Sequence, residues 1–307
     1  KKQDLALLHS SIIIKTTPII KKINPALVIV HGDTTSSLSI AMSATYCKIK
    51  IAHIEAGLRT FQKNEPFPEE INRKMIGSIS DFHFAPTKTA KENLKKEGIK
   101  KNIFITGNTI IDAVKLISSI SNQKNIKSFF EKILKDKSTT LNDTILITCH
   151  RRENFDKNII IISKTLIKLA KKYKNKIFIF PVHPNPNIKK IVYKLIPRMS
   201  NLFLISPLRY DRFLYLFKNS ILVISDSGGI QEECYYFKTP VILLRNYTER
   251  PEAIKHKLVH LSSINEKKII KLFEKLISYK LRNLNKNPYG IGNSSDKIKK
   301  ILQKHIY

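Results

Sequence analysis

Short apolar runs rich in β-branched residues alternate with longer amphipathic stretches along nearly the whole chain. A short run bounded by turn residues is typical of a strand buried on both faces, and a longer stretch with a period of about 3.6 residues is typical of a helix. Strands and helices that alternate in this way predict an α/β protein with parallel sheets. The strands we expect are residues 26–30, 49–54, 81–85, 103–106, 144–148, 176–180, 202–205, 221–224 and 241–244. The helices we expect are residues 3–22, 36–46, 69–80, 88–97, a helix from 110 onward, 127–134, 159–173, 187–195, 211–219, 230–237, 265–280 and 296–305.

The predicted elements fall into two similar α/β halves. Between them lies a lysine-rich region, residues 121–143, which we interpret as the connection between two domains. The first half opens on a helix and offers about four strands, whereas doubly wound domains normally begin with a strand. Because the chain also lacks an initiator methionine, we expect that one or two strand–helix units precede residue 1.

The charge of the chain is unusual. Its 307 residues have a hydrophobic content of 42%, as globular domains do, but a net charge of +31. A nucleic-acid-binding protein would have such a charge. However, the lysines are spread over the whole chain, without an arginine-rich arm or a basic block interleaved with aromatic residues. We therefore interpret the charge as a compositional bias and expect no nucleic-acid partner, although an anionic substrate would still be attracted.

The three cysteines, Cys47, Cys149 and Cys234, are far apart in the sequence. They form neither a zinc spacing nor a Cys-x-x-Cys pair, and we expect a cytoplasmic protein. Cys149 precedes His150, which allows a thiol nucleophile, but we prefer a small apolar residue at a strand end. No apolar run approaches the roughly 18 residues of a membrane span, and the start is a poor signal peptide, so we expect no membrane partner.

Residues 221–233 carry the strongest local signal. A short apolar strand leads through Ser227, Gly228 and Gly229 into a predicted helix. Such a turn points backbone N–H groups and the positive end of the helix dipole at one spot, which suits a phosphate. The alternative is an ordinary tight turn in which Asp226 caps the helix.

Four predicted strands end in groups that can do chemistry. These ends are His31-Gly32-Asp33, His53-Ile54-Glu55, His150-Arg151-Arg152-Glu153 and Ser227-Gly228-Gly229. Each has a simpler interpretation: Asp33 could cap the next helix and Glu55 could pair with Arg59. His150 could likewise be a structural histidine. Because ligands of open α/β sheets bind beyond the carboxyl ends of the strands, four such ends together predict a site.

The residue types at this edge indicate a kind of chemistry. Asp33, Glu55 and Glu69 suit general acid/base work, because crowded carboxylates push one another's pKa values apart. His150, Arg250 and the glycine turn suit an anionic group that gains charge as it leaves. These residues predict a cleft enzyme that handles a phosphorylated or nucleotide-linked substrate by proton transfer. No His/Asp cluster has metal-ligand spacing, so we expect no metal.

Eight motifs in chain order resemble those of a known family. They are Val30-His31-Gly32-Asp33-Thr34, His53-Ile54-Glu55-Ala56-Gly57-Leu58-Arg59-Thr60, Pro68-Glu69-Glu70-Ile71-Asn72-Arg73, Thr106-Gly107-Asn108-Thr109, His150-Arg151-Arg152-Glu153-Asn154, Pro181-Val182-His183-Pro184-Asn185-Pro186, Asp226-Ser227-Gly228-Gly229-Ile230-Gln231-Glu232-Glu233 and Glu249-Arg250-Pro251-Glu252-Ala253. Together they resemble the non-hydrolysing UDP-N-acetylglucosamine 2-epimerases, and the match covers nearly the whole chain.

The resemblance implies two Rossmann-like domains of the GT-B type facing a cleft, the first without its initial strand–helix units. The first domain would span residues 1–115, with a tail helix, 290–307, packing back on it, and the second, UDP-binding domain would span 116–289. The resemblance also implies a UDP-sugar substrate, no cofactor and a homodimer.

The reaction that the resemblance implies is the interconversion of UDP-N-acetylglucosamine and UDP-N-acetylmannosamine. A base removes the proton from the sugar carbon that bears the N-acetyl group while UDP departs. UDP then adds back to the glycal so that this carbon is inverted.

The resemblance also assigns roles by motif match. The acid/base candidates are Asp33, Glu55 and Glu69, and His150 is expected at the diphosphate. The UDP-binding candidates are Phe213 for the uracil, Ser227, Gly228 and Gly229 for phosphate, Glu233 for the ribose hydroxyls and Arg250 for the nucleotide end. Arg151, His183 and Glu69 fall where some bacterial members bind a second, activating UDP-sugar.

The sequence departs from the family at two places. The family opens with a strand ending in a Gly-Thr-Arg-Pro-Glu turn, which these residues do not contain, and Leu208 replaces a polar residue common beside the uracil pocket. The alternatives are a truncated, inactive sugar-nucleotide binder, a GT-B glycosyltransferase, a nucleic-acid-binding protein and a hydrolysing relative that releases free N-acetylmannosamine. The carboxylates of the first half argue against the glycosyltransferase.

Overall fold

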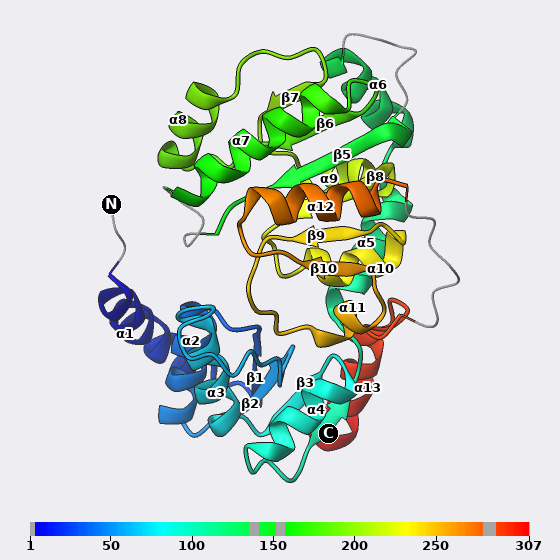
Figure 1. Cartoon of the computed structure of the whole chain (residues 1–307). Helices are drawn as coiled ribbons and strands as arrows, with labels where there is room; N and C mark the ends of the chain where they lie inside the picture. Colours follow the sequence, from blue (N-terminus) through cyan, green and yellow to red (C-terminus); the bar gives the residue numbers. More distant parts are fainter. Residues whose placement is uncertain (1–3, 135–140, 152–156, 279–286, 307) are drawn as a thin grey trace. The chain divides into compact units, whose positions relative to one another are not determined.

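The computed structural model describes residues 4–134, 141–151, 157–278 and 287–306, and it contains two compact units, each built on a parallel sheet (Figure 1). The first unit comprises Lys1–Asp112, Tyr247–Glu249 and Pro288–Tyr307, and the second comprises Ala113–Asn246 and Arg250–Asn287. The predicted α/β class with two parallel sheets is confirmed.

The first unit has a four-stranded sheet in the order β1-β2-β3-β4. Its strands are β1 (Leu27–His31), β2 (Lys50–Ile54), β3 (Phe82–Ala85) and β4 (Ile103–Ile105). Its helices are α1 (Leu5–Ile23), α2 (Thr35–Tyr46), α3 (Glu69–Ile79), α4 (Lys88–Lys96), the start of α5 (Thr109–Ile120) and α13 (Ser294–Ile306).

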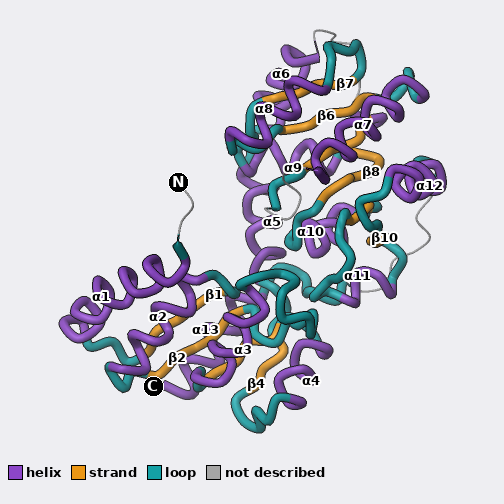
Figure 2. The backbone as a smooth tube through the Cα atoms, turned by 60° about the vertical axis from the view of Figure 1, so that its left-hand side comes forward, coloured by secondary structure: helices purple, strands orange, loops and turns teal. Residues whose placement is uncertain are grey.

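Successive side chains along each strand of this sheet are buried on opposite faces, because a pleated strand directs them to alternate sides. On one face, Ile51 of β2 packs with Leu38 of α2 and Ile76 of α3. On the other face, Phe82 of β3 packs with Ile298 of α13, the last helix of the chain (Figure 2). Helix α13 therefore packs on one face of this sheet, and α2 and α3 pack on the other.

Gly107 marks the point where the end of the chain joins this unit. Its φ is +85°, and a Cβ there would lie 2.7 Å from Ser294 Oγ and 2.8 Å from the carbonyl oxygen of Tyr289. The next residue, Asn108, donates its backbone N–H to the same carbonyl at 2.8 Å. Only glycine accepts both this backbone conformation and this close approach.

The second unit has a six-stranded sheet in the order β10-β9-β8-β5-β6-β7. Its strands are β5 (Thr144–Thr148), β6 (Ile177–Pro181), β7 (Leu202–Ile205), β8 (Ser220–Ser225), β9 (Val241–Leu243) and β10 (Val259–Leu261). Its helices are the rest of α5, α6 (Gln123–Leu134), η1 (Leu141–Asp143), α7 (Lys157–Lys172), α8 (Pro186–Leu195), α9 (Tyr210–Lys218), α10 (Ile230–Phe237), α11 (Pro251–Lys255) and α12 (Glu266–Leu276).

The strand order of the second sheet positions its candidate site. Counted within this unit, it is the doubly wound order in which the first and fourth strands, β5 and β8, are neighbours at the centre. The connections leave these two strands in opposite directions, and ligands of such sheets bind at this switch point beyond the carboxyl ends. His150 follows β5 and Ser227 follows β8.

The prediction that residues 121–143 connect two domains was wrong. The boundary between the units falls within α5, between Asp112 and Ala113. Helix α6 belongs to the second unit, where Phe130 is buried and its ring stacks on that of Tyr215 in α9, with centroids 6.0 Å apart. Lys124, Lys127 and Lys132 lie on the exposed face of this amphipathic helix, which made the region look like a linker.

Most predicted elements are present, with ends displaced by one or two residues, but three differ more. Helix α6 begins four residues earlier than expected, α12 ends at Leu276 instead of 280, and β10 was not predicted. Strand β10 has three residues and pairs at the edge with β9, so its sequence shows little periodicity.

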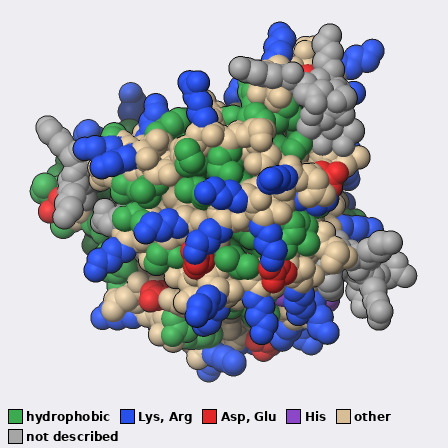
Figure 3. Space-filling view, turned by 45° about the horizontal axis from the view of Figure 1, so that its top comes forward, with side chains coloured by type: hydrophobic (Ala, Val, Ile, Leu, Met, Phe, Trp, Pro, Cys, Tyr) green, Lys and Arg blue, Asp and Glu red, His purple; other side chains and the backbone are tan. Residues whose placement is uncertain are grey.

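Lysine and arginine side chains on the face seen in Figure 3 are scattered among hydrophobic and uncharged ones, and they do not form one stripe there. A nucleic-acid-binding surface normally gathers its basic residues into a patch. The interpretation of the charge as a compositional bias stays a prediction.

Candidate active site

Two candidate carboxylates leave the first sheet at neighbouring positions. Strands β1 and β2 are parallel, with His31 opposite Ile54, and Asp33 and Glu55 follow directly beyond these ends. The backbone N–H of Gly32 donates to the Ile54 carbonyl at 3.0 Å, which extends the pairing by one residue. The sheet itself therefore brings the two acidic residues to one edge.

Asp33 is held by an arginine and does not cap a helix. The cap of α2 is Thr34, whose hydroxyl accepts the backbone N–H of Ser37 at 3.1 Å. Asp33 Oδ2 accepts hydrogen bonds from Arg73 Nε at 2.8 Å and lies 2.6 Å from its terminal nitrogen. Asn72 Nδ2 donates to the Asp33 carbonyl oxygen at 2.8 Å, so two adjacent residues of α3 fix this turn.

Arg73 gathers three carboxylates around one buried guanidinium. Besides Asp33, it pairs with Glu70 at 3.0 Å and lies 3.6 Å from Glu249, and the side chains of both glutamates are 1% exposed. The Glu70 carboxylate also accepts the backbone N–H groups of Thr60, at 3.1 Å, and Phe61, at 3.0 Å. Such a network is stable only while each charge keeps its partners, because a buried charge left unpaired is strongly unfavourable.

Glu55 has a strained backbone. Its φ of +67° lies in the left-handed region, which costs a non-glycine residue about 1 kcal/mol or more. Its carboxylate accepts a hydrogen bond from Asn108 Nδ2 at 3.1 Å, and a Cβ at Gly32 would lie only 3.2 Å from its Oε2. The simpler interpretation, a pair with Arg59, was wrong, because Arg59 binds both oxygens of Glu97, at 2.6 and 2.8 Å.

Glu69 is the first residue of α3. It precedes Arg73 by four residues and so shares its side of the helix. The Glu69 Oε2 atom is buried and has no hydrogen-bond partner among the described residues. A buried carboxylate oxygen without a donor is rare, and a substrate group is one way to satisfy it.

The two buried histidines of this sheet are neutral. Burial lowers the pKa of His53 to about 3, and His53 Nε2 donates to the Gly32 carbonyl at 2.8 Å. Burial also lowers the pKa of His83, its neighbour on β3, to about 4. Neither imidazole is available as an acid at neutral pH, so they support the backbone of the edge and leave its chemistry to the carboxylates.

Asp226 anchors the loop after β5 and does not cap α10, so the interpretation of a capping aspartate was wrong. Its fully buried carboxylate accepts the backbone N–H groups of His150 and Arg151, both at 3.0 Å. It also lies 3.1 Å from His150 Nδ1, and Cys149 Sγ donates to it at 3.3 Å. This carboxylate fixes the tautomer of His150, because Nδ1 must carry the proton and Nε2 faces away.

The turn before α10 has the form that a bound anion needs. Its N-cap is Gly229, which has no side chain with which to cap the helix. Ser225 Oγ accepts the Ser227 backbone N–H at 2.9 Å and so shapes the turn. A Cβ at Gly229 would meet no atom within 4 Å in the part of the chain that the structure describes. Open space therefore lies beside this turn.

Two acidic residues on α10 have different partners. Glu232 lies 3.0 Å from Arg250 Nε, and both side chains are almost fully buried. Glu233 Oε1 accepts the Tyr210 hydroxyl at 2.6 Å. Burial raises the pKa of Glu233, while the Tyr210 hydrogen bond and the Arg250 charge act against this rise. The Tyr210 ring stacks on Phe213, with centroids 6.3 Å apart and planes 13° apart.

His183 lies beside His150, with their ring centroids 6.3 Å apart. Burial, and then the charge of His150, lower the pKa of His183. Its Nδ1 accepts the Asn185 backbone N–H at 3.2 Å, so the proton of the neutral ring is on Nε2. Arg151 is half-buried, and its backbone N–H donates to Asp226. Arg152 and Glu153 of the same motif lie outside the described residues.

Four residues hold candidate residues in place at these edges, and the sequence reasoning assigned none of them this role. They are Arg73, Asn108, Asp226 and Tyr210. Each binds a candidate residue that is far away in the sequence, so no local pattern reveals the contact. The spacing of four between Glu69 and Arg73 on one helix was the only available signal.

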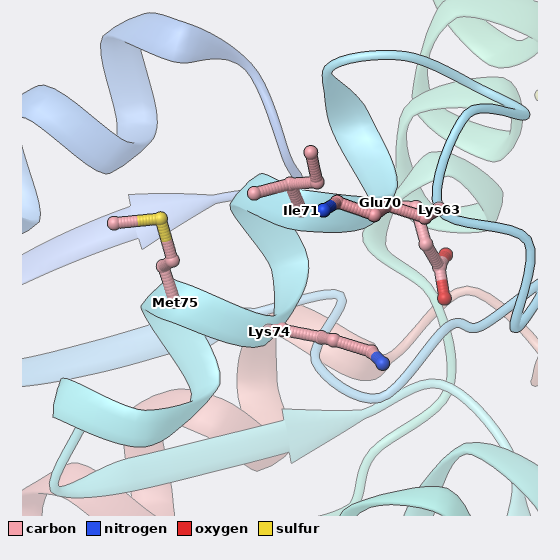
Figure 4. Close-up of a pocket in the computed structure, with 5 residues that line it drawn as sticks. All are labelled: Lys63, Glu70, Ile71, Lys74 and Met75. Atoms are coloured by element: carbon pink, nitrogen blue, oxygen red, sulfur yellow. The ribbon is translucent and has the colours of Figure 1, made fainter.

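A hollow of about 260 Å³ lies at α3 (Figure 4). Lys63, Glu70, Ile71, Lys74 and Met75 line it, and none of these is among the predicted site residues. Among the residues described, no group of three or more His, Cys, Asp or Glu side chains could hold a metal ion. The described helices also include none with the length and apolar character of a membrane span.

The two edges define a class of protein. One offers carboxylates that can exchange protons, and the other offers a histidine, an arginine and a helix start that suit a diphosphate. This combination fits an enzyme acting on a nucleotide-linked substrate. The family model described as UDP-N-acetylglucosamine 2-epimerase matches residues 1–303, and the chain belongs to this family.

Relatives and solved structures agree with this assignment. The chain is 42% identical to the UDP-N-acetylglucosamine 2-epimerase of Campylobacter jejuni over an alignment of 312 positions, which covers 98% of this chain and 81% of that protein. The crystal structure of UDP-GlcNAc 2-epimerase from Neisseria meningitidis bound to UDP-GlcNAc matches with a TM-score of 0.92 and 40% identity, over 98% of this chain and 82% of that one. The Methanocaldococcus jannaschii enzyme in complex with UDP-GlcNAc and UDP matches with a TM-score of 0.88 and 36% identity, over 99% and 82%.

Proposed function

We propose that this protein is a UDP-N-acetylglucosamine 2-epimerase, which interconverts UDP-N-acetylglucosamine and UDP-N-acetylmannosamine by elimination and re-addition of UDP. Its membership of the family and its likeness to structures with bound UDP-GlcNAc support the proposal. One observation carries it furthest. In both sheets, residues of the family motifs follow adjacent strands: Asp33 and Glu55 follow β1 and β2, and His150 and Ser227 follow β5 and β8.

In this proposal the carboxylates of the first sheet move the protons. Asp33, Glu55 and Glu69 are the acid/base candidates for the sugar carbon that bears the N-acetyl group. Proton transfer needs groups held in a fixed direction, and the ion pair of Asp33 with Arg73 and the hydrogen bond of Glu55 with Asn108 meet this need. No carbonyl acidifies the proton that leaves, so departure of the diphosphate must contribute much of the driving force.

The residues of the second sheet hold UDP. His150 and the turn of Ser227, Gly228 and Gly229 face the diphosphate, where they stabilise the negative charge that develops as it leaves. The nucleoside candidates are Phe213 for the uracil, Glu233 for the ribose hydroxyls and Arg250 for the nucleotide end. Because Asp226 holds Nδ1 of His150, the imidazole Nε2 is the atom that contacts the phosphate.

Further parts of the proposal concern partners and location. Arg151, His183 and Glu69 are candidates for binding a second UDP-sugar as an effector. We further propose a homodimer in the cytoplasm that works without a cofactor. Size measurement by light scattering tests the oligomeric state, and activity with and without added UDP-N-acetylglucosamine during the reverse reaction tests the effector.

The decisive experiment is incubation of the protein with UDP-N-acetylglucosamine in deuterium oxide. We expect the mannosamine epimer, with deuterium at the carbon that carries the N-acetyl group. An epimer without deuterium would contradict proton abstraction. A protein that binds UDP but forms no epimer would be an inactive sugar-nucleotide binder, and transfer of the sugar to an added acceptor would indicate a glycosyltransferase.

A further inference from the structure

The side chain of Tyr210 joins two of the proposed nucleotide-binding residues. It begins helix α9, and its hydroxyl donates to Glu233 Oε1 on α10 at 2.6 Å. Its ring stacks on Phe213, three residues further along α9, with an interplanar angle of 13°. One side chain thus contacts both the carboxylate proposed for the ribose and the ring proposed for the uracil.

The carboxylate of Glu233 needs such a donor. Glu233 is 5% exposed, and burial raises its pKa, which favours the protonated form. A protonated carboxyl would lose half of its capacity to accept hydrogen bonds from two ribose hydroxyls. The Tyr210 hydrogen bond acts in the opposite direction and lowers this pKa.

The geometry of the bond also sets which oxygen is available. Tyr210 donates to Oε1, which leaves Oε2 to accept hydrogen bonds from the ribose hydroxyls in this proposal. Burial and the neighbouring Glu233 and Glu232 charges raise the pKa of Tyr210, so its hydroxyl stays protonated and acts as the donor. Rotation of the carboxylate would break a short, charge-assisted hydrogen bond, which is among the stronger ones in proteins.

We propose that Tyr210 is a positioning residue that sets the preference of this site for a ribonucleotide over a deoxyribonucleotide, by orienting Glu233 toward the ribose hydroxyls. The proposal rests on the proposed function, because it takes UDP as the ligand. Tyr210 is not proposed to contact the reacting atoms. Its contribution lies in how strongly the site distinguishes nucleotides that differ only in their sugar hydroxyls.

The test compares binding of UDP and 2′,3′-dideoxyuridine diphosphate by isothermal titration calorimetry. The wild-type protein should bind UDP at least about tenfold more tightly, the range for a hydrogen bond to a charged group. Tyr210→Phe should reduce this preference to about twofold by weakening UDP alone, because the phenylalanine ring keeps the stack on Phe213. Tyr236→Phe, on α10 and 38% exposed, is the matched control and should keep the full preference.

A double-variant comparison separates the hydroxyl from packing. Glu233→Gln should remove the same preference, and Tyr210→Phe added to Glu233→Gln should cause no further loss, because the two residues act through one bond. Equal weakening of both nucleotides by Tyr210→Phe, or an unchanged preference, would overturn the role of Tyr210. Wild-type protein that binds neither nucleotide would contradict the proposed function itself, and equal wild-type affinity for both would contradict the ribose role of Glu233 and this inference with it.

Discussion

The edges of the two sheets are built with opposite charges. In the first unit, a candidate carboxylate, Asp33, is held by the buried cation Arg73. In the second unit, a candidate imidazole, His150, is held by the buried anion Asp226. In each unit the group proposed to meet the substrate is partly exposed, and its partner is almost fully buried. The comparison teaches that one motif supplies the exposed group, while a residue of a second motif, distant in the sequence, fixes its direction.

The largest expected effect comes from removing the cation of the first unit. Arg73→Met leaves three carboxylates without their shared partner, and we expect a loss of about 3–5 kcal/mol in the free energy of unfolding. Epimerase activity should fall below detection. Chemical denaturation and the deuterium assay measure both. Arg198→Met, which removes an exposed arginine from the second unit, is the control and should change neither.

The next prediction concerns the loss of stability of the first unit in acid. His53 and His83 are neutral in the folded first unit, with pKa values of about 3 and about 4, whereas an unfolded histidine has a pKa near 6.5. The unfolded chain therefore binds more protons as the pH falls below 6.5, so stability is lost on acidification. From pH 7 to pH 5 we expect a loss of about 2 kcal/mol for each histidine.

Urea denaturation at pH 7, 6 and 5 measures this loss, and hydrogen exchange followed by mass spectrometry assigns it to peptides of one unit. His83→Leu cannot titrate and should remove about half of the pH dependence. Equal acid sensitivity of the wild type and this variant would contradict the neutral, buried state of His83.

Removing the anion of the second unit should affect catalysis more than stability. Asp226→Asn keeps the shape of the side chain but no longer specifies that Nδ1 of His150 carries the proton. We expect kcat to fall about 100-fold, the lower end of the loss when one group that stabilises developing negative charge is removed. Steady-state kinetics measure both constants, and we expect the KM to stay unchanged. A KM rise with unchanged kcat would mean that Asp226 acts only on UDP binding.

The smallest expected effect tests the open space at the helix start. Gly229 has helical φ and ψ, and a Cβ there meets no described atom, so Gly229→Ala should keep the stability within about 0.5 kcal/mol or increase it slightly. The methyl group would, however, occupy the space proposed for the diphosphate. We expect UDP binding to weaken about tenfold by calorimetry. Unchanged affinity would place the diphosphate elsewhere.

The sequence predicted the fold well because both sheets consist of short, apolar, β-branched runs, such as residues 144–148, whose period is unambiguous. It also placed the candidates at strand ends, because this position follows from element order alone. The sequence did not predict the partner of a side chain that had several possible partners. Arg59 has Glu55 nearby in the sequence but binds Glu97, which only the packing of α4 brings close.

The charge of a residue also did not reveal its local role. Asp226 precedes a helix, so a cap was the simplest interpretation, yet its carboxylate turns to the end of a neighbouring strand and binds His150 there. Local hydrogen-bonding patterns predict caps because they are short-range. The competing contact spans the chain between residues 150 and 226, and the central pairing of β5 and β8 creates it.

The left-handed backbone of Glu55 lowers stability at a position where the proposed activity requires the carboxylate. Glycine or asparagine adopts this conformation with less strain, so Glu55→Gly should gain up to about 1 kcal/mol of stability if its side chain served no purpose. A library of variants sorted only for heat resistance should therefore enrich smaller residues at this position. Selection of the same library for variants that incorporate solvent deuterium into the product should enrich glutamate at this position.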